Sequence, residues 1–159
     1  MSTLRTVFER LGYSDVTTYI QSGNVVFDSP ERRSTALAPR IEVALANEFG
    51  LAIGVVVRSA RELNTVIETN PFLGRVKDPS KLHVLFLDAA PDPQRLETID
   101  AARFVPDQYA VGAREIYLHC PNGVGRSKLA AALGPKLAPL SATMRNWNTT
   151  TKLAEFAAR

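Results

Sequence analysis

Hydrophobic positions in the first half of the chain alternate between helical and strand-like spacing. Apolar residues three or four apart predict helices, and short β-branched runs predict strands. The predicted elements, in chain order, are a helix over 3–11, strands over 15–20 and 24–28 joined by a turn at 21–23, a helix ending near 49–50, a strand over 53–57 and a helix ending before 70. The first half therefore has the order α-β-β-α-β-α.

Two of these helices have specific local support. Apolar residues spaced four apart from Leu37 to Phe49 predict one stripe that faces the core. Ser59 and Glu62 have the spacing of a capping box, in which each residue caps the other at the start of a helix.

The second half begins with an apolar strand and then shows a similar order. Its predicted elements are a strand over 82–87, a helix over 92–102, strands over 108–111 and 115–119, a helix over 125–133, a strand over 141–145 and a helix through 156. The order βαββαβ is that of a ferredoxin-like fold. We therefore expect an α+β protein with two ferredoxin-like subdomains, residues 1–78 and 79–159, of which the first lacks its initial strand.

The missing strand has a physical consequence. The first strand is central in this topology, so a sheet without it has unpaired edges. A chain start upstream, another segment in the gap, or a weakly folded N-terminal half would each account for it. If the strand is absent, part of the stripe from Leu37 to Phe49 becomes exposed, which favours a homodimer or strand exchange.

Composition places the chain among ordinary globular proteins. Of its 159 residues, 45% are hydrophobic and 22% are charged, and no apolar run is long enough to span a bilayer. Cys120 is the only cysteine, which excludes internal disulfides and favours a cytoplasmic location. The two histidines and this cysteine lack metal-ligand spacing, so we expect neither a metal nor a cofactor.

The net charge of +3 comes from a basic excess late in the chain. After residue 113 the basic residues are Arg114, Arg126, Lys128, Lys136, Arg145, Lys152 and Arg159, against Glu115 and Glu155. A local basic excess favours anionic partners such as phosphate groups or nucleic acid. The alternative is a solvated basic surface without a partner.

The predicted strand, loop and helix of residues 119–128 have the chemistry of an anion site. The first turn of a helix offers free N–H groups and partial positive charge. Gly123 and Gly125 allow the backbone to approach a ligand closely, and Arg126 can chelate two phosphate oxygens. We expect a phosphate-bearing or other anionic ligand to contact these residues together with Ser127 and Lys128.

The same stretch has the spelling H-C-x-x-G-x-G-R-S, which is typical of a cysteine-phosphatase loop. In that hypothesis Cys120 is the nucleophile, Arg126 holds the phosphate and Asp107 is the general acid. The alternative is that Cys120 is a small buried residue at a strand end, which is the common role of a free cysteine.

Topology predicts which loops meet. In a ferredoxin-like sheet, the loops at 105–107, 120–127 and 145–147 share one edge. Arg145 is then a second phosphate contact, Asn146 a further ligand, and Trp147 a stacking surface. The alternatives are an ion pair for Arg145 and a core position for Trp147.

Several stretches together resemble one bacterial family. They are Tyr19 to Phe27, Asn70 to Phe72, Leu118 to Gly123, Gly125 to Leu129 and Thr143 to Asn148. Their order and spacing resemble the family named domain of unknown function 1697. The resemblance implies a two-subdomain α+β fold, no established reaction and no reliance on a cysteine at position 120. Members usually open with an apolar strand and a glycine-rich loop that contains arginine. This chain starts at the helix after them, which suggests a truncated start.

Three functional hypotheses follow. The leading one is a binding protein, without catalysis, for an anionic ligand at residues 119–128. The second is the cysteine-dependent phosphatase. The third is a nucleic-acid or protein interaction module, which is disfavoured because the aromatic-rich strand motif of RNA-recognition sheets is absent from the sequence.

Overall fold

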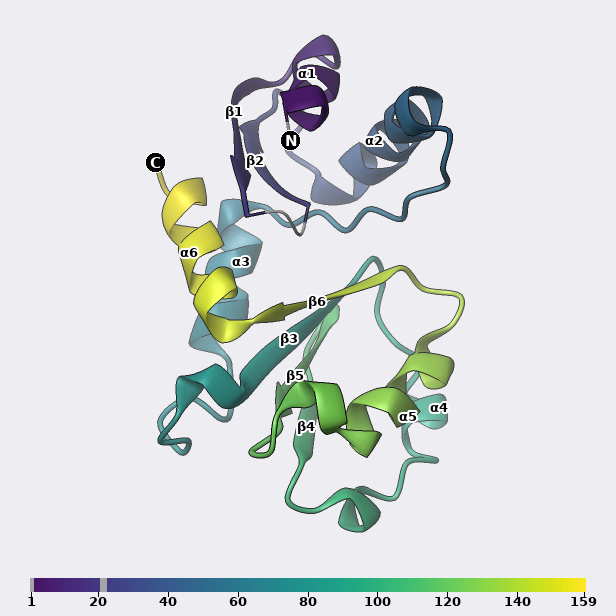
Figure 1. Ribbon diagram of the computed structural model, residues 1–159, viewed down its shortest axis with the longest axis vertical. Coiled ribbons are helices and arrows are strands. Elements are labelled where there is room, and N and C mark those ends of the chain that lie inside the picture. Colours follow the sequence, from purple (N-terminus) through teal and green to yellow (C-terminus); the bar gives the residue numbers. More distant parts are fainter. Residues whose placement is uncertain (1, 21–22) are drawn as a thin grey trace. The chain divides into compact units, whose positions relative to one another are not determined.

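The computed structural model of the protein describes residues 2–20 and 23–159, and these residues form six α-helices and two antiparallel sheets (Figure 1). The chain is therefore an α+β protein. It divides into two compact units, Met1–Leu63 with Lys152–Arg159, and Asn64–Thr151. The predicted boundary between residues 78 and 79 falls inside the second unit, and the chain passes between the units within two helices.

The first unit is built on one β-hairpin. Its elements are α1 (Ser2–Arg10), β1 (Ser14–Tyr19), β2 (Asn24–Asp28), α2 (Ser34–Phe49) and the start of α3 (Ala60–Glu68). β1 and β2 pair antiparallel, and their connection at 21–23 lies partly outside the described residues. One apolar cluster joins α1, the hairpin and α2, and its buried members are Val7, Phe8, Tyr13, Val16, Leu37, Ile41 and Leu45.

The apolar stripe of α2 behaves as its spacing predicts over most of its length. Leu37, Ile41 and Leu45 are buried, whereas Phe49 at the end of the helix is 41% exposed. The helix stops at Gly50, whose φ of 69° lies in the left-handed region and whose N–H donates to the carbonyl of Ala46. Because three of the four stripe residues are buried, the stripe gives no support for a homodimer.

The start of α3 matches the predicted capping box. The N–H of Ser59 donates to Glu62 Oε2 at 2.7 Å, and the N–H of Glu62 donates to Ser59 Oγ at 3.1 Å. Glu62 Oε1 also accepts a hydrogen bond of 3.0 Å from the hydroxyl of Ser34, a buried residue in the first turn of α2. One carboxylate thus ties the starts of two helices together.

The strand predicted over 53–57 is wrong. These residues have no strand pairing, although Val55 and Val57 still pack against the apolar cluster. The N–H of Val55 donates to the side chain of Glu42. A strand needs a neighbour for its backbone groups, and β1 and β2 are the only strands among the described residues of this unit.

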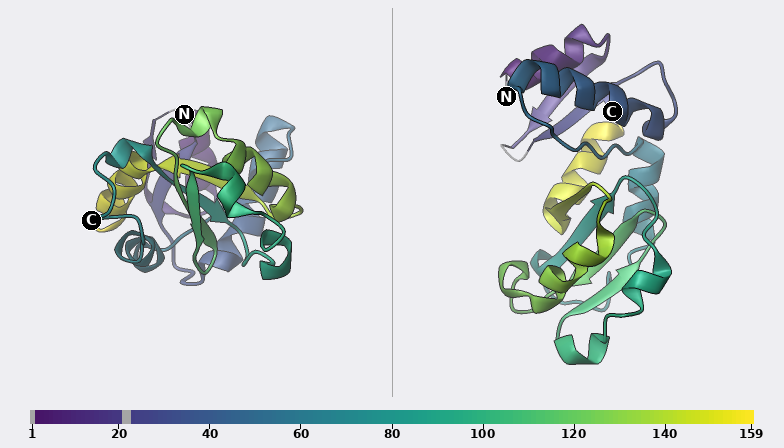
Figure 2. Two further views of the ribbon diagram at one scale, coloured as in Figure 1. Left: turned by 90° about the horizontal axis from the view of Figure 1, so that it is seen from below. Right: turned by 90° about the vertical axis from the view of Figure 1, so that its right-hand side faces the viewer.

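The second unit contains a four-stranded antiparallel sheet in the order β4-β5-β3-β6. Its elements are β3 (Leu82–Leu87), α4 (Pro93–Leu96), β4 (Gln108–Val111), β5 (Glu115–His119), α5 (Lys128–Leu137), β6 (Ala142–Asn146) and the start of α6 (Trp147–Ala157), with single turns of 3₁₀ helix at Pro79–Lys81, Ala101–Phe104 and Val124–Arg126. The helices α4 and α5 cover one face of this sheet (Figures 1 and 2). The core between them includes Leu85, Ile116, Leu118, Leu129 and Leu133.

Two helices of this unit differ from prediction. The helix expected over 92–102 is interrupted: Asp92 caps α4, and the side chain of Asp100 accepts from the N–H of Ala102 and starts a separate 3₁₀ turn. The helix expected over 125–133 begins three residues later and continues through Pro135. Arg95 donates to the carbonyls of Pro135 and Ala138 and so satisfies acceptors at the end of α5.

Candidate functional site

The register of the sheet brings three loops to one edge. His119 at the end of β5 pairs with Leu82 and Gln108, and Asn146 at the end of β6 pairs with His83. The loops at 105–107, 120–127 and 146–147 therefore share this edge, in agreement with the predicted topology. β3 lies between β5 and β6, so the third loop starts two strand spacings, about 10 Å, from the end of β5.

The N-terminus of α5 is already beside a carboxylate. Ser127 is the N-cap, and its Oγ accepts from the N–H of Ala130 at 3.0 Å. The same hydroxyl donates to Asp107 Oδ2 at 2.8 Å. A carboxylate at this end of a helix interacts favourably with the helix dipole. Asp107 and Ser127 thus meet as the topology predicts, but Asp107 places negative charge where the ligand's charge was expected.

The loop offers fewer free amides than its sequence suggests. The N–H of Gly123 donates to the carbonyl of Cys120 at 2.9 Å, and the N–H of Ser127 donates to the carbonyl of Val124 at 3.1 Å. Gly123 has a φ of 95°, which requires glycine, whereas Gly125 has no such constraint. The expected concave nest of N–H groups is therefore only partly available to a ligand.

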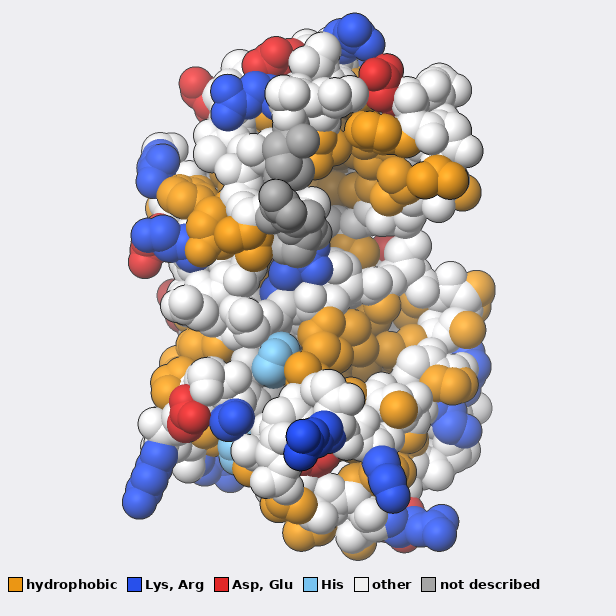
Figure 3. All heavy atoms as spheres, in the orientation of Figure 1, with side chains coloured by type: hydrophobic (Ala, Val, Ile, Leu, Met, Phe, Trp, Pro, Cys, Tyr) orange, Lys and Arg blue, Asp and Glu red, His pale blue; other side chains and the backbone are white. Residues whose placement is uncertain are grey.

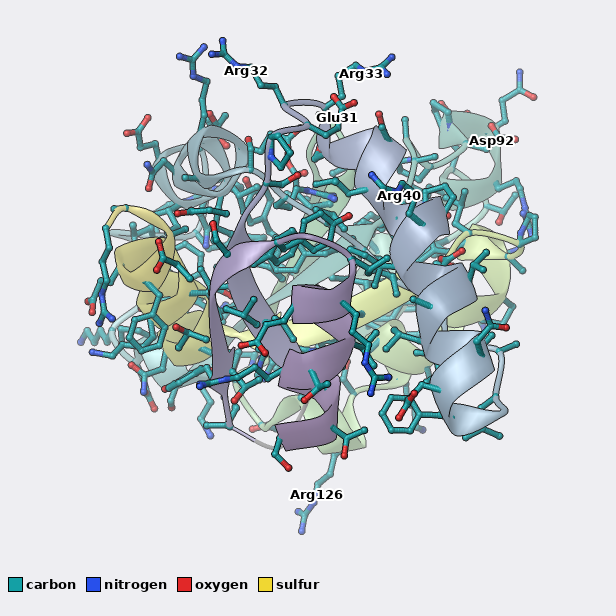
Figure 4. The ribbon with its side chains drawn as sticks, turned by 90° about the horizontal axis from the view of Figure 1, so that it is seen from above. Glu31, Arg32, Arg33, Arg40, Asp92 and Arg126 are labelled. Carbon is teal, nitrogen blue, oxygen red and sulfur yellow. The ribbon has the colours of Figure 1, made fainter. Side chains whose placement is uncertain are left out.

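The two cations of the loop are exposed to solvent. Arg126 and Lys128 are both exposed, and Figure 4 shows the Arg126 side chain extending outward from the molecule. Arg126 therefore does not close over the loop as a phosphate clamp would. A ligand could contact both Arg126 and Lys128 only on the outer side of the first turn of α5, the side that faces solvent.

The environment of Cys120 is opposite to the one a nucleophile needs. The residue is 0% exposed and belongs to the apolar core beneath α5. Burial raises the pKa of its thiol, a hydrogen bond with Ser127 offsets part of this rise, and the negative charge of Asp107 makes a smaller contribution that raises the pKa. A catalytic cysteine needs a lowered pKa and access to substrate. The phosphatase hypothesis therefore fails at its nucleophile, and Cys120 is a core residue.

The residues expected from the third loop do not join the first two. Arg145 pairs with Val84, and the neighbouring pair of Leu85 with Met144 faces α5, so Arg145 faces the other side of the sheet. Its guanidinium donates to Thr143 Oγ1 at 2.6 Å and to the carbonyl of Met144 at 2.8 Å, and burial lowers its pKa.

Asn146 and Trp147 have structural roles at the start of α6. Asn146 Oδ1 accepts from the N–H of Thr149 at 2.7 Å, which makes Asn146 the helix cap. Trp147 is only 6% exposed, so its ring is not a surface for stacking. The sequence signal that was missed at both helices is a polar residue directly before the first turn, Ser127 for α5 and Asn146 for α6.

Within residues 2–20 and 23–159, no group of three or more His, Cys, Asp or Glu side chains is arranged to hold a metal ion. Among the helices of the same residues, none combines the length and the apolar character needed to cross a membrane.

Comparisons with known proteins agree on the family and the fold. A family model described as "Protein of unknown function (DUF1697)" matches residues 1–117. A solved structure, that of the conserved bacterial protein SP0830 from Streptococcus pneumoniae, is similar with a TM-score of 0.75 and 20% sequence identity, over 99% of this chain and 88% of the other. At this identity the likeness concerns the fold alone. No curated protein matches the chain. The chain belongs to the DUF1697 family of proteins of unknown function.

Proposed function

We propose that this protein binds an anionic, phosphate-bearing ligand without catalysis, on the outer side of the first turn of α5. The observation that carries the proposal is the position of Arg126 and Lys128, two exposed cations beside a helix N-terminus. The side chain of the N-cap Ser127 accepts from one N–H of this turn, that of Ala130, and a helix end has further N–H groups that an anion can contact.

Asp107 sets the strength of this site. Its carboxylate lies at the same helix end and repels a second negative charge. At a separation of about 6 Å and an effective dielectric constant of roughly 20 to 80, two unit charges repel by about 1–3 kcal/mol. We therefore expect weak binding of simple anions and stronger binding only of ligands that reach both Arg126 and Lys128.

The test compares two charge-removing variants at opposite ends of α5. Lys128→Gln removes a cation at the proposed site, and Lys136→Gln removes one near the end of the helix. Inorganic phosphate or a mononucleotide should raise the melting temperature of the unchanged protein and of Lys136→Gln, and should raise that of Lys128→Gln less. Equal stabilisation of all three proteins would refute the proposed position.

The lack of catalysis is tested at the cysteine. Cys120→Ser should bind phosphate as the unchanged protein does, because the thiol is buried in the core. Hydrolysis of a generic aryl phosphate that is lost on this substitution would contradict the proposal.

The distribution of basic side chains disfavours a nucleic-acid role. Figure 3 shows Lys and Arg side chains scattered over the visible face, among acidic and neutral ones, and not in one continuous patch. Binding of an oligonucleotide with a steep loss of affinity in salt would favour nucleic acid over a small anion.

We also propose that the second unit is ferredoxin-like. Its elements follow the order βαββαβ, and its strand order β4-β5-β3-β6 places the first and third strands of the unit at the centre. This strand order also supports the proposed anion site, because it brings the loops that flank the first turn of α5 to one sheet edge.

A further inference from the structure

A histidine at the start of β3, His83, lies beside β6 and has no role in the proposed anion site. His83 is paired with Leu118 on β5 and with Asn146 on β6. Residues directly opposite in an antiparallel sheet share a face, and His83 alternates with Leu85 and Leu87, so its side chain lies on the face covered by α5. We call His83, Asn146 and the first turn of α6 the β3–β6 corner.

The imidazole of His83 is poorly prepared to carry a charge. Its Nδ1 is buried and has no hydrogen-bond partner within the described residues. A proton added to Nδ1 would therefore be a buried donor without an acceptor, which is costly.

The acids of the loops at this sheet edge are already engaged with other groups. Among the described residues, the charged ones nearest these strand ends are Asp78 and Lys81 before β3, Asp107 before β4, and Arg126 and Lys128 at α5. Asp78 accepts from the N–H and the hydroxyl of Ser80, and Asp107 accepts from the hydroxyl of Ser127. The first turns of α5 and α6 contain no acidic residue, and both present the positive end of a helix dipole to this edge. The thiol of Cys120, on the same sheet face, is neutral while its pKa is raised.

We propose that His83 is an acid-sensitive switch: its protonation weakens the pairing of β3 with β6 at Asn146 and thereby the cap that starts α6. Asn146 connects the two events because it is both the strand partner of His83 and the acceptor for the N–H of Thr149 at 2.7 Å. The hydroxyl of Thr150, which is fully buried, also donates to the carbonyl of Asn146. An opening at Asn146 therefore reaches the start of α6.

The sign of the pH dependence follows from the folded-state environment. Burial lowers the pKa of His83 below its ordinary value of 6.5, and the hydrogen bond to the Lys81 carbonyl only partly offsets this. The closed corner binds the proton less well than the open one. The equilibrium constant for closing the corner is therefore at its maximum above pH 6.5. It falls by up to tenfold for each pH unit below 6.5, until the pH reaches the folded-state pKa of His83.

The chain contains its own reporter and its own control. Trp147 is the only tryptophan, it directly follows Asn146, and it is buried, so its fluorescence should shift to the red when the corner opens. His119 is the only other histidine. It lies on the opposite face of the sheet, with its ring 6.1 Å from that of Phe72.

The experiment is a fluorescence titration from pH 8 to pH 5 on the full chain and two variants. We expect a red shift with a midpoint below 6.5 in the unchanged protein and in His119→Gln, and its loss in His83→Gln. A red shift that persists in His83→Gln, or none in the unchanged protein, would overturn the proposal. If His83→Gln does not fold, the proton resonances of His83 in the unchanged protein decide: a midpoint below 6.5 supports the switch, and one at or above 6.5 rejects it.

Discussion

Removing the hydroxyl of Tyr117 should destabilise the protein by about 2 kcal/mol. Tyr117 lies on β5, on the sheet face opposite α5, and is only 2% exposed. Its hydroxyl is 2.8 Å from the carbonyl oxygen of Val66 and 2.9 Å from Thr69 Oγ1, both on or next to α3. These contacts fasten the end of α3 to the sheet.

The magnitude follows from the number of available protons. The hydroxyl of Thr69 donates its one proton to the carbonyl of Thr65 at 2.7 Å. The single proton of the Tyr117 hydroxyl is therefore the only one available to the Val66 carbonyl and Thr69 Oγ1. Tyr117→Phe removes one net hydrogen bond, about 1 kcal/mol, and leaves a buried helix-end carbonyl without its donor, about 1 kcal/mol more. For a chain of this length the melting temperature should fall by roughly 4–8 °C.

The assay is urea denaturation followed by far-UV circular dichroism, with Tyr109→Phe as the matched control. Tyr109 is a half-buried tyrosine on the neighbouring strand, and its hydroxyl makes only a 3.5 Å contact with the carbonyl of Leu96. The control should lose less than about 0.5 kcal/mol. Burial raises the pKa of Tyr117 above 10.0, so the stability from its hydroxyl should be full below pH 10 and be lost as pH rises through the folded-state pKa. If Tyr117→Phe costs no more than the control, the reasoning is refuted.

Three further predictions concern other parts of the molecule. Glu62→Ala should cost about 2 kcal/mol in urea denaturation because it breaks the capping box and removes the hydrogen bond from the buried hydroxyl of Ser34, and a loss below about 0.5 kcal/mol would contradict this. Gly112→Ala should destabilise the protein by about 1–3 kcal/mol because its Cβ would overlap the buried carboxylate of Glu115. Gly134→Ala, in open space within α5, should stabilise it by up to about 1 kcal/mol. The reverse order of melting temperatures for these two variants would be inconsistent with the structure. Cys120 should resist iodoacetamide at pH 7–8 until the protein unfolds, as followed by mass spectrometry, and rapid native alkylation would reject its core position.

Local signals in the sequence predicted local structure well. The capping box at Ser59 and Glu62 and the buried stripe of α2 depend on residues within a few positions of each other. The strand expected over 53–57 depended on a distant partner instead, and no such partner is present among the described residues of the first unit. Its apolar alternation survives only in the packing of Val55 and Val57.

The candidate site also combines features that the sequence predicted with features that it could not predict. Topology alone placed Asp107 near the loop of residues 120–127, and the hydrogen bond with Ser127 agrees with that placement. What the sequence could not show is how those groups are used. Asp107 satisfies the helix end from within the protein, and Cys120 faces the core. Arg145 lies on the sheet face away from α5 because side chains alternate between the two faces along β6, and a position near the loop does not reveal which face a residue takes.

The central claim, that the first turn of α5 binds an anion against the charge of Asp107, is tested most directly by Asp107→Asn. The amide oxygen can still accept from Ser127, so the variant removes the negative charge and retains the hydrogen bond. Titration of inorganic phosphate, followed by amide chemical shifts of residues 124–130, should give a dissociation constant about tenfold lower for Asp107→Asn than for the unchanged protein. An unchanged or higher dissociation constant, or shifts located elsewhere in the chain, would contradict the account.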